Sequence, residues 1–420
     1  MPGTLDIGFI HLNYPRNERA SETSAATEYI RYIHNQGHNV VVYCPDNPDD
    51  SGEIADDLET RFLNVDPSFP RHKGEELNRK ILANDDLRTH EILHCYTGMG
   101  IPGVGKISRR TETKSVITLN AYNSICPKNN VLYFEKYPCS SRGFAKCSAC
   151  TAHSNLSEFI SKVSISEGIS AGNSQINMFR DIRIANKCEH NLDYIDAFHV
   201  YGDHVESIYN DFGYPTEKFY RVPIPKNNIF DSDMSTRSPD EFKSLYVGRL
   251  SRDKGVDKLP DIIRILHEHY GHNIELTVVG EGGDLDGIIQ NEFANRNLDN
   301  YVNFKGYIKN HNLPSVYNSH DIFIYPGRVC EAFGRVFLEA LASSTPVISS
   351  DVGIADEILG PGGVIVNGQP KEFAREISRL INNKEKYIQM AERGNKKANE
   401  YNINKLGPAI EELYETILPN

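Results

Sequence analysis

Both halves of this 420-residue chain repeat one alternation, in which a short apolar run is followed by an amphipathic stretch. A short apolar run bounded by turn residues is typical of a buried strand, and the amphipathic stretch after it of a helix that covers the sheet. This βα alternation favours doubly wound parallel sheets. The strands that we expect are Leu5–Ile10, Asn39–Tyr43, Glu91–Cys95, Ser115–Thr118, Ala197–Val200, Ser244–Val247, Ile274–Val279, Asp321–Tyr325 and Pro346–Ser349.

The length of the chain allows two domains, each with a core of its own. Val222–Asp233 is rich in Pro, Asn and Asp and is typical of a hinge between domains. We therefore expect a first domain over residues 1–225 and a second over 226–395. A helical pattern runs through Lys384–Leu418, and residues 396–420 form a separate last segment.

Charge and hydropathy exclude several classes of protein. The formal net charge of −12 argues against a nucleic-acid-binding protein. No window is apolar enough to span a membrane, and Met1–Ile10 lacks the basic and apolar regions of a signal peptide. A cytoplasmic protein is expected. Lys106, Arg109 and Arg110 form either an ordinary solvated helix face or a peripheral contact with the inner face of a membrane.

Pro326–Ala342 (PGRVCEAFGRVFLEALA) combines glycines, two acids and an apolar helix. The first turn of a helix presents unpaired N–H groups and the positive end of its dipole, which favours an anion. Gly334 has no side chain, so a diphosphate can approach the N–H groups of Gly334, Arg335 and Val336.

Glu331 and Glu339 stand on either side of that helix start, one in the loop and one on the second turn. A carboxylate accepts hydrogen bonds from paired hydroxyls. We expect Glu331 beside a sugar and Glu339 beside a ribose. Taken by their spacing alone, the two glutamates also fit the solvated flanks of an amphipathic helix.

The arrangement E-A-F-G-R-V-F-L-E, followed by Ala340–Val347, Asp351–Gly353 and Asp356–Glu357, resembles the E-x7-E signature of glycosyltransferase family 4. Members of that family are retaining enzymes of the GT-B fold. The resemblance implies two Rossmann-like domains that face a cleft, with residues 396–420 crossing back onto the first domain. It covers the second domain closely and the first domain loosely.

The same resemblance implies a donor site at the carboxyl ends of the strands in the second domain. Arg249 and Lys254, beyond the turn at Gly248, resemble the cations that hold the donor diphosphate. They would neutralise the charge that builds on the leaving nucleotide. Gly280 resembles the glycine turn below the base, and the segment at Tyr307 and Ile308 resembles the one whose backbone meets the base edge.

The first domain departs from the family pattern in two places. Asn13–Ser24 lacks the Gly-Gly loop that faces the acceptor and the donor phosphate, and Arg16 and Arg19 are the cations available there. Asn120 stands where relatives carry a His that faces the sugar. An Asn can donate or accept a hydrogen bond with a hydroxyl, but it does not titrate.

Four of the eight cysteines, Cys126, Cys139, Cys147 and Cys150, fall in one polar stretch that resembles an insert of some family 4 enzymes. Cytosolic thiols stay reduced, which argues against disulfides. Four thiolates that include a C-x-x-C complete a structural zinc shell. Zinc, an iron–sulfur cluster and a set of free thiols are the three interpretations left open.

The sequence as a whole is identified as that of a retaining glycosyltransferase. The resemblance implies transfer of a sugar from a UDP- or GDP-sugar to a glycan, lipid-linked or other hydroxyl, with no metal required for catalysis. Two alternatives stay open. One is a nucleotide-sugar 2-epimerase of the same fold, against which Asn120 argues; the other is a non-catalytic scaffold that binds nucleotide-sugars.

Overall fold

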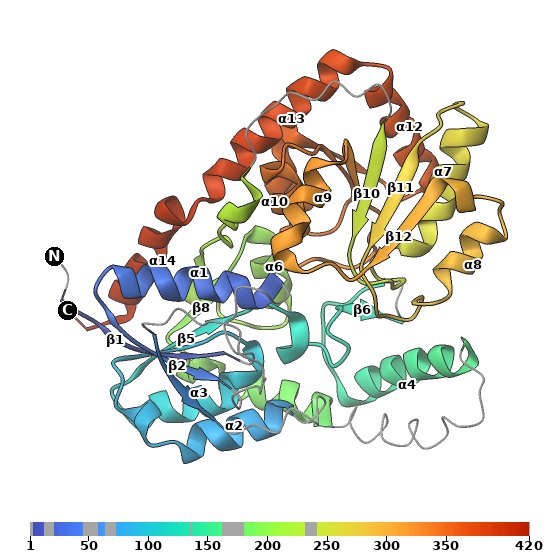
Figure 1. Cartoon of the computed structure of the whole chain (residues 1–420). Helices are drawn as coiled ribbons and strands as arrows, with labels where there is room; N and C mark the ends of the chain where they lie inside the picture. The colour runs from blue at the N-terminus through green and yellow to red at the C-terminus, as the bar shows by residue number, and fades with distance from the viewer. Residues whose placement is uncertain are drawn as a thin grey trace. The chain divides into compact units, whose positions relative to one another are not determined.

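The computed structural model describes residues 3–11, 21–44, 58–63, 73–134, 137–161, 180–231 and 242–419. They form two compact units, each with its own sheet (Figure 1). Of the described residues, the first unit contains those up to Pro223 and those from Leu406, and the second contains those between Ile224 and Lys405. The domain boundaries expected at 225/226 and 395/396 stay predictions about functional domains.

The first unit has a seven-stranded parallel sheet in the order β3-β2-β1-β4-β5-β8-β9. Its strands are β1 (Asp6–Ile10), β2 (Asn39–Cys44), β3 (Glu59–Phe62), β4 (Ile92–Cys95), β5 (Lys114–Thr118), β8 (Ala197–Val200) and β9 (Phe219–Arg221). Its helices include α1 (Ser21–Asn35), α2 (Lys73–Ala83), α3 (Ile101–Ser108), α4 (Phe144–Ser161) and α6 (Asp203–Asp211). A short antiparallel pair, β6 (Leu132–Tyr133) and β7 (Tyr137–Pro138), precedes α4.

Most of the last helix, α14 (Ile403–Ile417), belongs to the first unit. Tyr414 lies in the core, where its hydroxyl is 2.7 Å from Nδ1 of the buried His94. Glu411 accepts a hydrogen bond from the hydroxyl of Tyr32 at 3.0 Å and lies 3.1 Å from Nε2 of His38. These contacts fasten the carboxyl end of the chain to the N-terminal sheet.

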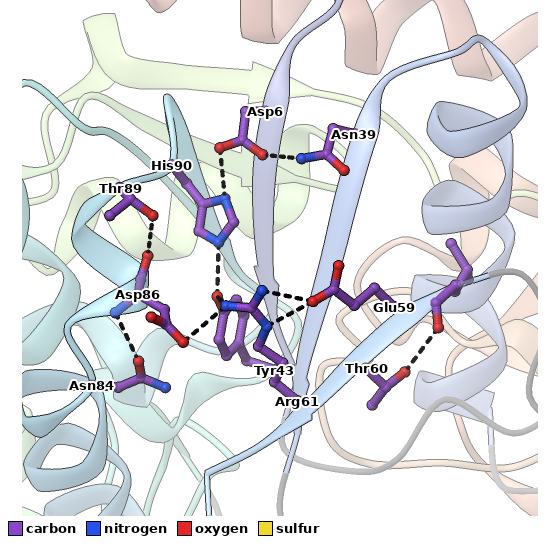
Figure 2. A network of polar contacts seen from close by, with 11 residues as sticks. Asp6, Asn39, Tyr43, Glu59, Thr60, Arg61, Asn84, Asp86, Thr89 and His90 are labelled. Carbon is purple, nitrogen blue, oxygen red and sulfur yellow. Dashed lines mark hydrogen bonds and ion pairs between the residues drawn. The ribbon is translucent and has the colours of Figure 1, made fainter.

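A polar network joins β1, β2 and β3 to the segment before β4 (Figure 2). His90 bridges Asp6 and Tyr43, with Nδ1 3.1 Å from the carboxylate and Nε2 2.8 Å from the hydroxyl. Arg61, on the edge strand, lies 3.5 Å from that hydroxyl and 2.8 Å from the carboxylate of Asp86. These groups pair with one another, so we assign the network to holding the sheet together and not to ligand binding.

The second unit has a six-stranded parallel sheet in the order β12-β11-β10-β13-β14-β15. Its strands are β10 (Lys243–Val247), β11 (Glu275–Val279), β12 (Val302–Gly306), β13 (Ile322–Tyr325), β14 (Val347–Ser350) and β15 (Gly363–Val366). The helices are α7 (Leu259–Glu268), α8 (Ile289–Ala294), α9 (Leu313–Asn318), α10 (Arg335–Ala342), α11 (Ala355–Leu359), α12 (Pro370–Ile381) and α13 (Lys384–Ala398). Apolar residues of the central strands and of α7 and α12 form its core.

The two doubly wound sheets confirm the predicted fold class, and every predicted strand is found with small shifts at its ends. The sequence reasoning missed β3, β9, β12 and β15, which are the edge strands of the two sheets. An edge strand is paired on one side only and is more exposed, as the pattern of β3 (Glu59–Phe62) shows. The sequences of β3, β9 and β12 therefore lack the continuous apolar run by which a central parallel strand is identified, whereas β15 (Gly363–Val366) is apolar and was missed despite its run.

Candidate functional site

The strand order of the second unit reverses at β10, which pairs with β11 on one side and β13 on the other. In open α/β sheets, ligands bind beyond the carboxyl ends of the strands at such a switch point. The segments that begin there are Gly248–Lys258, after β10, and Pro326–Gly334, after β13. They contain five of the residues that the sequence selects, namely Gly248, Arg249, Lys254, Glu331 and Gly334.

The two segments are in direct backbone contact. Gly255 has a φ of +74°, and a Cβ there would lie 1.9 Å from the carbonyl oxygen of Pro326. The backbone N–H of Arg328 donates to the carbonyl of Asp253 at 2.9 Å. The Arg328 guanidinium also binds both carboxylate oxygens of Asp257, at 2.6 and 2.7 Å. Only glycine fits at position 255, and the contact fixes one segment against the other.

Lys254 and Glu331 meet where the segments join. The Lys254 ammonium pairs with Oε1 of Glu331, and the hydroxyl of Tyr325 donates to the same oxygen. The side chains of Lys254 and Glu331 are only 19% and 15% exposed. An isolated bridge to Gly353 also holds the Glu331 backbone. The structure thus brings together two predicted site residues that stand 77 positions apart.

Arg249 lies in the segment after β10, with its side chain 62% exposed and its guanidinium 3.0 Å from Asp253. Gly248 and Gly280 lie at the ends of neighbouring strands, where a Cβ on Gly280 would be 1.9 Å from the carbonyl oxygen of Gly248. Both glycines therefore have a packing role whether or not they contact a ligand. Tyr307, just beyond β12, is 57% exposed, and Ile308 is half-buried.

Gly334 is the N-cap of α10 and has a φ of +71°. A Cβ at this position would lie 2.7 Å from the ring of Phe337. Arg335 and Glu339 are buried on the helix that follows, and Val336 is half-buried. Burial raises the pKa of Glu339, and the positive charge of Arg335 opposes that shift.

Glu339 is less accessible than the sequence suggests, with 7% of its surface exposed. The hydroxyl of Tyr317, on α9, donates to its Oε2 at 3.1 Å. Burial and the charge of Glu339 raise the pKa of Tyr317 well above its usual value, so the phenol stays protonated and acts as the donor. Contact between Glu339 and a ribose stays a prediction.

Asn120 lies in the first unit, just beyond β5. Its Nδ2 donates to the carbonyl of Tyr96 at 3.1 Å. Its Oδ1 is buried and has no hydrogen-bond partner among the described residues. An unpaired buried acceptor is uncommon in proteins. Most of the segment Asn13–Ser24, including Arg16 and Arg19, lies outside the described residues.

Cys126, Cys139, Cys147 and Cys150 line one cavity of about 20 Å³ in the first unit. All four are free thiols. Burial raises the pKa of Cys147, and the other three thiols add to that shift. Within the described ranges, no three His, Cys, Asp or Glu side chains are arranged so that they could hold a metal ion. The sequence grouping is thus matched in space, and the metal stays a prediction.

Tyr325, Asp253, Asp257, Arg328 and Tyr317 belong to the site or support it, and the sequence reasoning did not select them. Tyr325 carried a usable signal, because it ends a predicted central strand directly before Pro326 and Gly327. Arg328 and Asp257 carried no such signal, since nothing in the sequence indicates that they pair. In the described part of the chain no helix is long and apolar enough to cross a membrane.

Residues 229–397 match the family described as glycosyl transferases group 1. The match covers the second unit and less than half of the chain. CapM of Staphylococcus aureus, described as a capsular polysaccharide biosynthesis glycosyltransferase, is 28% identical over 46% of this chain and 50% of its own. Mannosylfructose-phosphate synthase of Agrobacterium fabrum is 36% identical over 34% of this chain and 35% of its own. The chain thus spans half or less of the length of these relatives.

Solved structures resemble the chain over nearly its whole length. Sucrose-phosphate synthase from Thermosynechococcus elongatus has a TM-score of 0.72 at 17% identity, with 98% of each chain covered. Anabaena Alr3699/HepE, solved in complex with UDP-glucose, has a TM-score of 0.66 at 15% identity, with 98% of this chain and 100% of that chain covered. These neighbours are GT-B glycosyltransferases, so the predicted GT-B fold is confirmed.

Proposed function

We propose that this protein is a retaining glycosyltransferase that moves a sugar from a nucleotide-diphosphate sugar to a hydroxyl acceptor. One observation carries the proposal. The ion pair of Lys254 and Glu331 lies at the switch point of a Rossmann-like sheet, within the stretch that matches glycosyl transferases group 1. A cation and a carboxylate at that place suit a diphosphate and a sugar, respectively.

The cations act on the leaving group. Lys254 and Arg249 lie on the segment after β10 and would neutralise charge on the diphosphate as its bond to the sugar breaks. The N–H groups at Gly334, Arg335 and Val336 open α10 and would bind a phosphate oxygen, aided by the helix dipole. A positive charge and a helix start would then contact the same diphosphate.

The carboxylates act on the hydroxyls of the donor. Glu331 has one oxygen bound by Lys254 and Tyr325, which leaves Oε2 as its acceptor for a sugar hydroxyl. Glu339 has Oε2 bound by Tyr317, which leaves Oε1 for a ribose hydroxyl. In the proposed reaction the acceptor hydroxyl attacks from the face that the diphosphate leaves, and its proton passes to the departing phosphate.

The donor and the acceptor belong to the proposal as well. UDP is favoured over GDP as the nucleotide, because a structural neighbour is solved in complex with UDP-glucose and the pneumococcal O-GlcNAc transferase GtfA in complex with UDP and GlcNAc. The acceptor is a glycan, a lipid-linked sugar or another hydroxyl. A lipid-linked acceptor would bring the protein to a membrane surface, where Lys106, Arg109 and Arg110 could contact anionic headgroups.

We also propose that the cysteine-rich insert holds a structural zinc ion, with Cys126, Cys139, Cys147 and Cys150 as its ligands. The four thiols of the insert line one cavity, and zinc favours four thiolate ligands. In this structure two of the thiols donate to backbone carbonyls, from Cys139 to Ser141 at 3.4 Å and from Cys150 to Leu132 at 3.5 Å. Binding of zinc would require these side chains to turn toward the cavity.

The test is incubation of the protein with UDP- and GDP-sugars that carry a labelled sugar, with and without glycan and lipid-linked acceptors. A labelled glycoside with the anomeric configuration of the donor supports the proposal. A labelled nucleotide-sugar with an inverted C2 centre would establish the epimerase instead. Saturable binding with no labelled product of either kind would establish the scaffold.

A further inference from the structure

Oε1 of Glu331 accepts from two donors that differ in freedom of movement. Lys254 reaches it through a flexible side chain, and Tyr325 reaches it through a fixed aromatic ring. We propose that Tyr325 is a positioning residue that holds Glu331 in place while Lys254 turns from this carboxylate to the donor diphosphate. The inference rests on the proposed function, because it requires a diphosphate beside Lys254.

Donor binding would remove the Lys254 cation from the Glu331 carboxylate. A diphosphate attracts the Lys254 ammonium more strongly than a single carboxylate does, because it carries more negative charge. The Glu331 side chain is only 15% exposed, so water cannot fully replace the lost cation. A largely buried carboxylate that loses its partner is destabilised and tends to move or to recapture the cation.

Tyr325 can stabilise the Glu331 carboxylate after Lys254 leaves, because its ring is fixed in place. It ends the central strand β13 and is 2% exposed. Phe337 packs edge-on against it with ring centroids 5.0 Å apart. Gly327 approaches so closely that a Cβ there would lie 2.7 Å from the Tyr325 ring. The hydroxyl therefore keeps its place when the Lys254 side chain rotates.

The Tyr325 hydroxyl also keeps its proton. Burial, followed by the negative charge of Glu331, raises the pKa of Tyr325 well above its ordinary value. A protonated phenol beside a carboxylate is a donor, so the direction of the hydrogen bond is fixed. Among the described residues the donors to the Glu331 carboxylate are Lys254 and Tyr325, which leaves Tyr325 when Lys254 departs.

The test is a double-mutant cycle on nucleotide affinity. The dissociation constants of UDP and GDP are measured by calorimetry for the wild type, Tyr325→Phe, Lys254→Ala and the double variant. Without the hydroxyl, Glu331 depends on Lys254 and retains it, so Tyr325→Phe should weaken nucleotide binding about tenfold or more, the size of a hydrogen bond to a charged group. In the Lys254→Ala background the same substitution should change the constant less than about twofold.

Tyr246→Phe is the matched control. Tyr246 is as buried as Tyr325, but its hydroxyl donates to the backbone carbonyl of Arg249 at 2.7 Å. Tyr246→Phe should lower the melting temperature about as much as Tyr325→Phe does. Its effect on nucleotide affinity should be the same with Lys254 present and in the Lys254→Ala variant.

The outcomes separate the two proposals. A wild-type protein that binds neither UDP nor GDP overturns the proposed function and this inference together. Nucleotide binding that Tyr325→Phe weakens equally with and without Lys254, or does not weaken at all, overturns the positioning role and leaves the proposed function intact.

Discussion

The two sheets share a pattern in which the first strand lies between the second strand and a later one, but their carboxyl ends differ. Beyond β10 and β13 the backbones touch at Gly255 and Pro326, and the largely buried charges of Lys254 and Glu331 are paired. Beyond β5 in the first unit, Asn120 retains a buried oxygen with no partner among the described residues. The insert beside it gathers four thiols around a small cavity.

This difference follows from what each unit is proposed to bind. A nucleotide diphosphate is the same ligand in many enzymes, so a short run of glycines, cations and acids describes its site. An acceptor differs from one enzyme to the next, and residues that touch it follow no common pattern. The family match is confined to residues 229–397, in agreement with this division.

The largest expected effect concerns Lys254 and Glu331. Lys254→Ala and Glu331→Ala should each lower turnover about a hundredfold or more, because loss of one charge-stabilising group in comparable sites costs on the order of 3 kcal/mol. Arg264→Ala is the control, since this arginine pairs with Asp261 and Glu268 on the surface of α7. The measurement is the steady-state rate with the preferred donor. Near-normal turnover in both variants would show that the catalytic site is not at Lys254 and Glu331.

The next largest expected effect is a difference between the two units in their stability at low pH. His94 and His199 are buried in the first unit on either side of Thr118, at 2.6 and 3.0 Å from its hydroxyl. Burial lowers the pKa of His94 well below its usual value and that of His199 to about 4. The unfolded chain, with histidine pKa values near 6.5, therefore takes up protons before the folded chain does.

The free energy of unfolding of the first unit should then be highest above pH 6.5 and fall as the pH drops toward 4. His199 alone accounts for roughly 3 kcal/mol of that change. Hydrogen exchange followed from pH 7.5 to 4.5 should show amides of the first unit losing protection before those of the second. His190→Gln, which removes an exposed histidine of the first unit, should leave this order unchanged; simultaneous loss in both units would contradict it.

A pair of glycine variants tests the close approach that joins the segments of the second unit. Gly255 and Gly271 have nearly the same φ, +74° and +70°, but a Cβ at Gly271 meets nothing within 4 Å. Gly271→Ala should cost about 1 kcal/mol of stability through backbone strain. Gly255→Ala should cost about 1–3 kcal/mol more, because its Cβ would collide with Pro326. Urea unfolding gives both values, and equal costs would mean that the contact is unimportant.

The smallest expected effect concerns the cysteines. Protein purified without chelator should contain close to one zinc per chain, and Cys147→Ser combined with Cys150→Ser should release it. Turnover should fall, while nucleotide affinity, which we place in the second unit, should stay nearly constant. Cys44→Ser is the control, since this buried thiol lies outside the insert. Full activity in metal-free protein with four titratable thiols would refute the zinc site.

The sequence by itself determined the central strands of both sheets and the motif from Pro326 to Ala342. Both are local signals, because a buried parallel strand is a continuous apolar run and a helix start is marked by its glycine. Three of the four edge strands were missed because their partial exposure weakens that run, as at Glu59–Phe62, whereas β15 (Gly363–Val366) was missed although its run is apolar.

Only the tertiary structure decided which side chains meet. Lys254, Tyr325 and Glu331 are neighbours because β10 and β13 are adjacent in the sheet, a pairing that depends on the packing of the whole unit. Burial of Glu339 under Tyr317 depends in the same way on where α9 packs. A residue's type and spacing indicate the chemistry available to it, whereas contacts between distant segments determine its partner, its exposure and its charge.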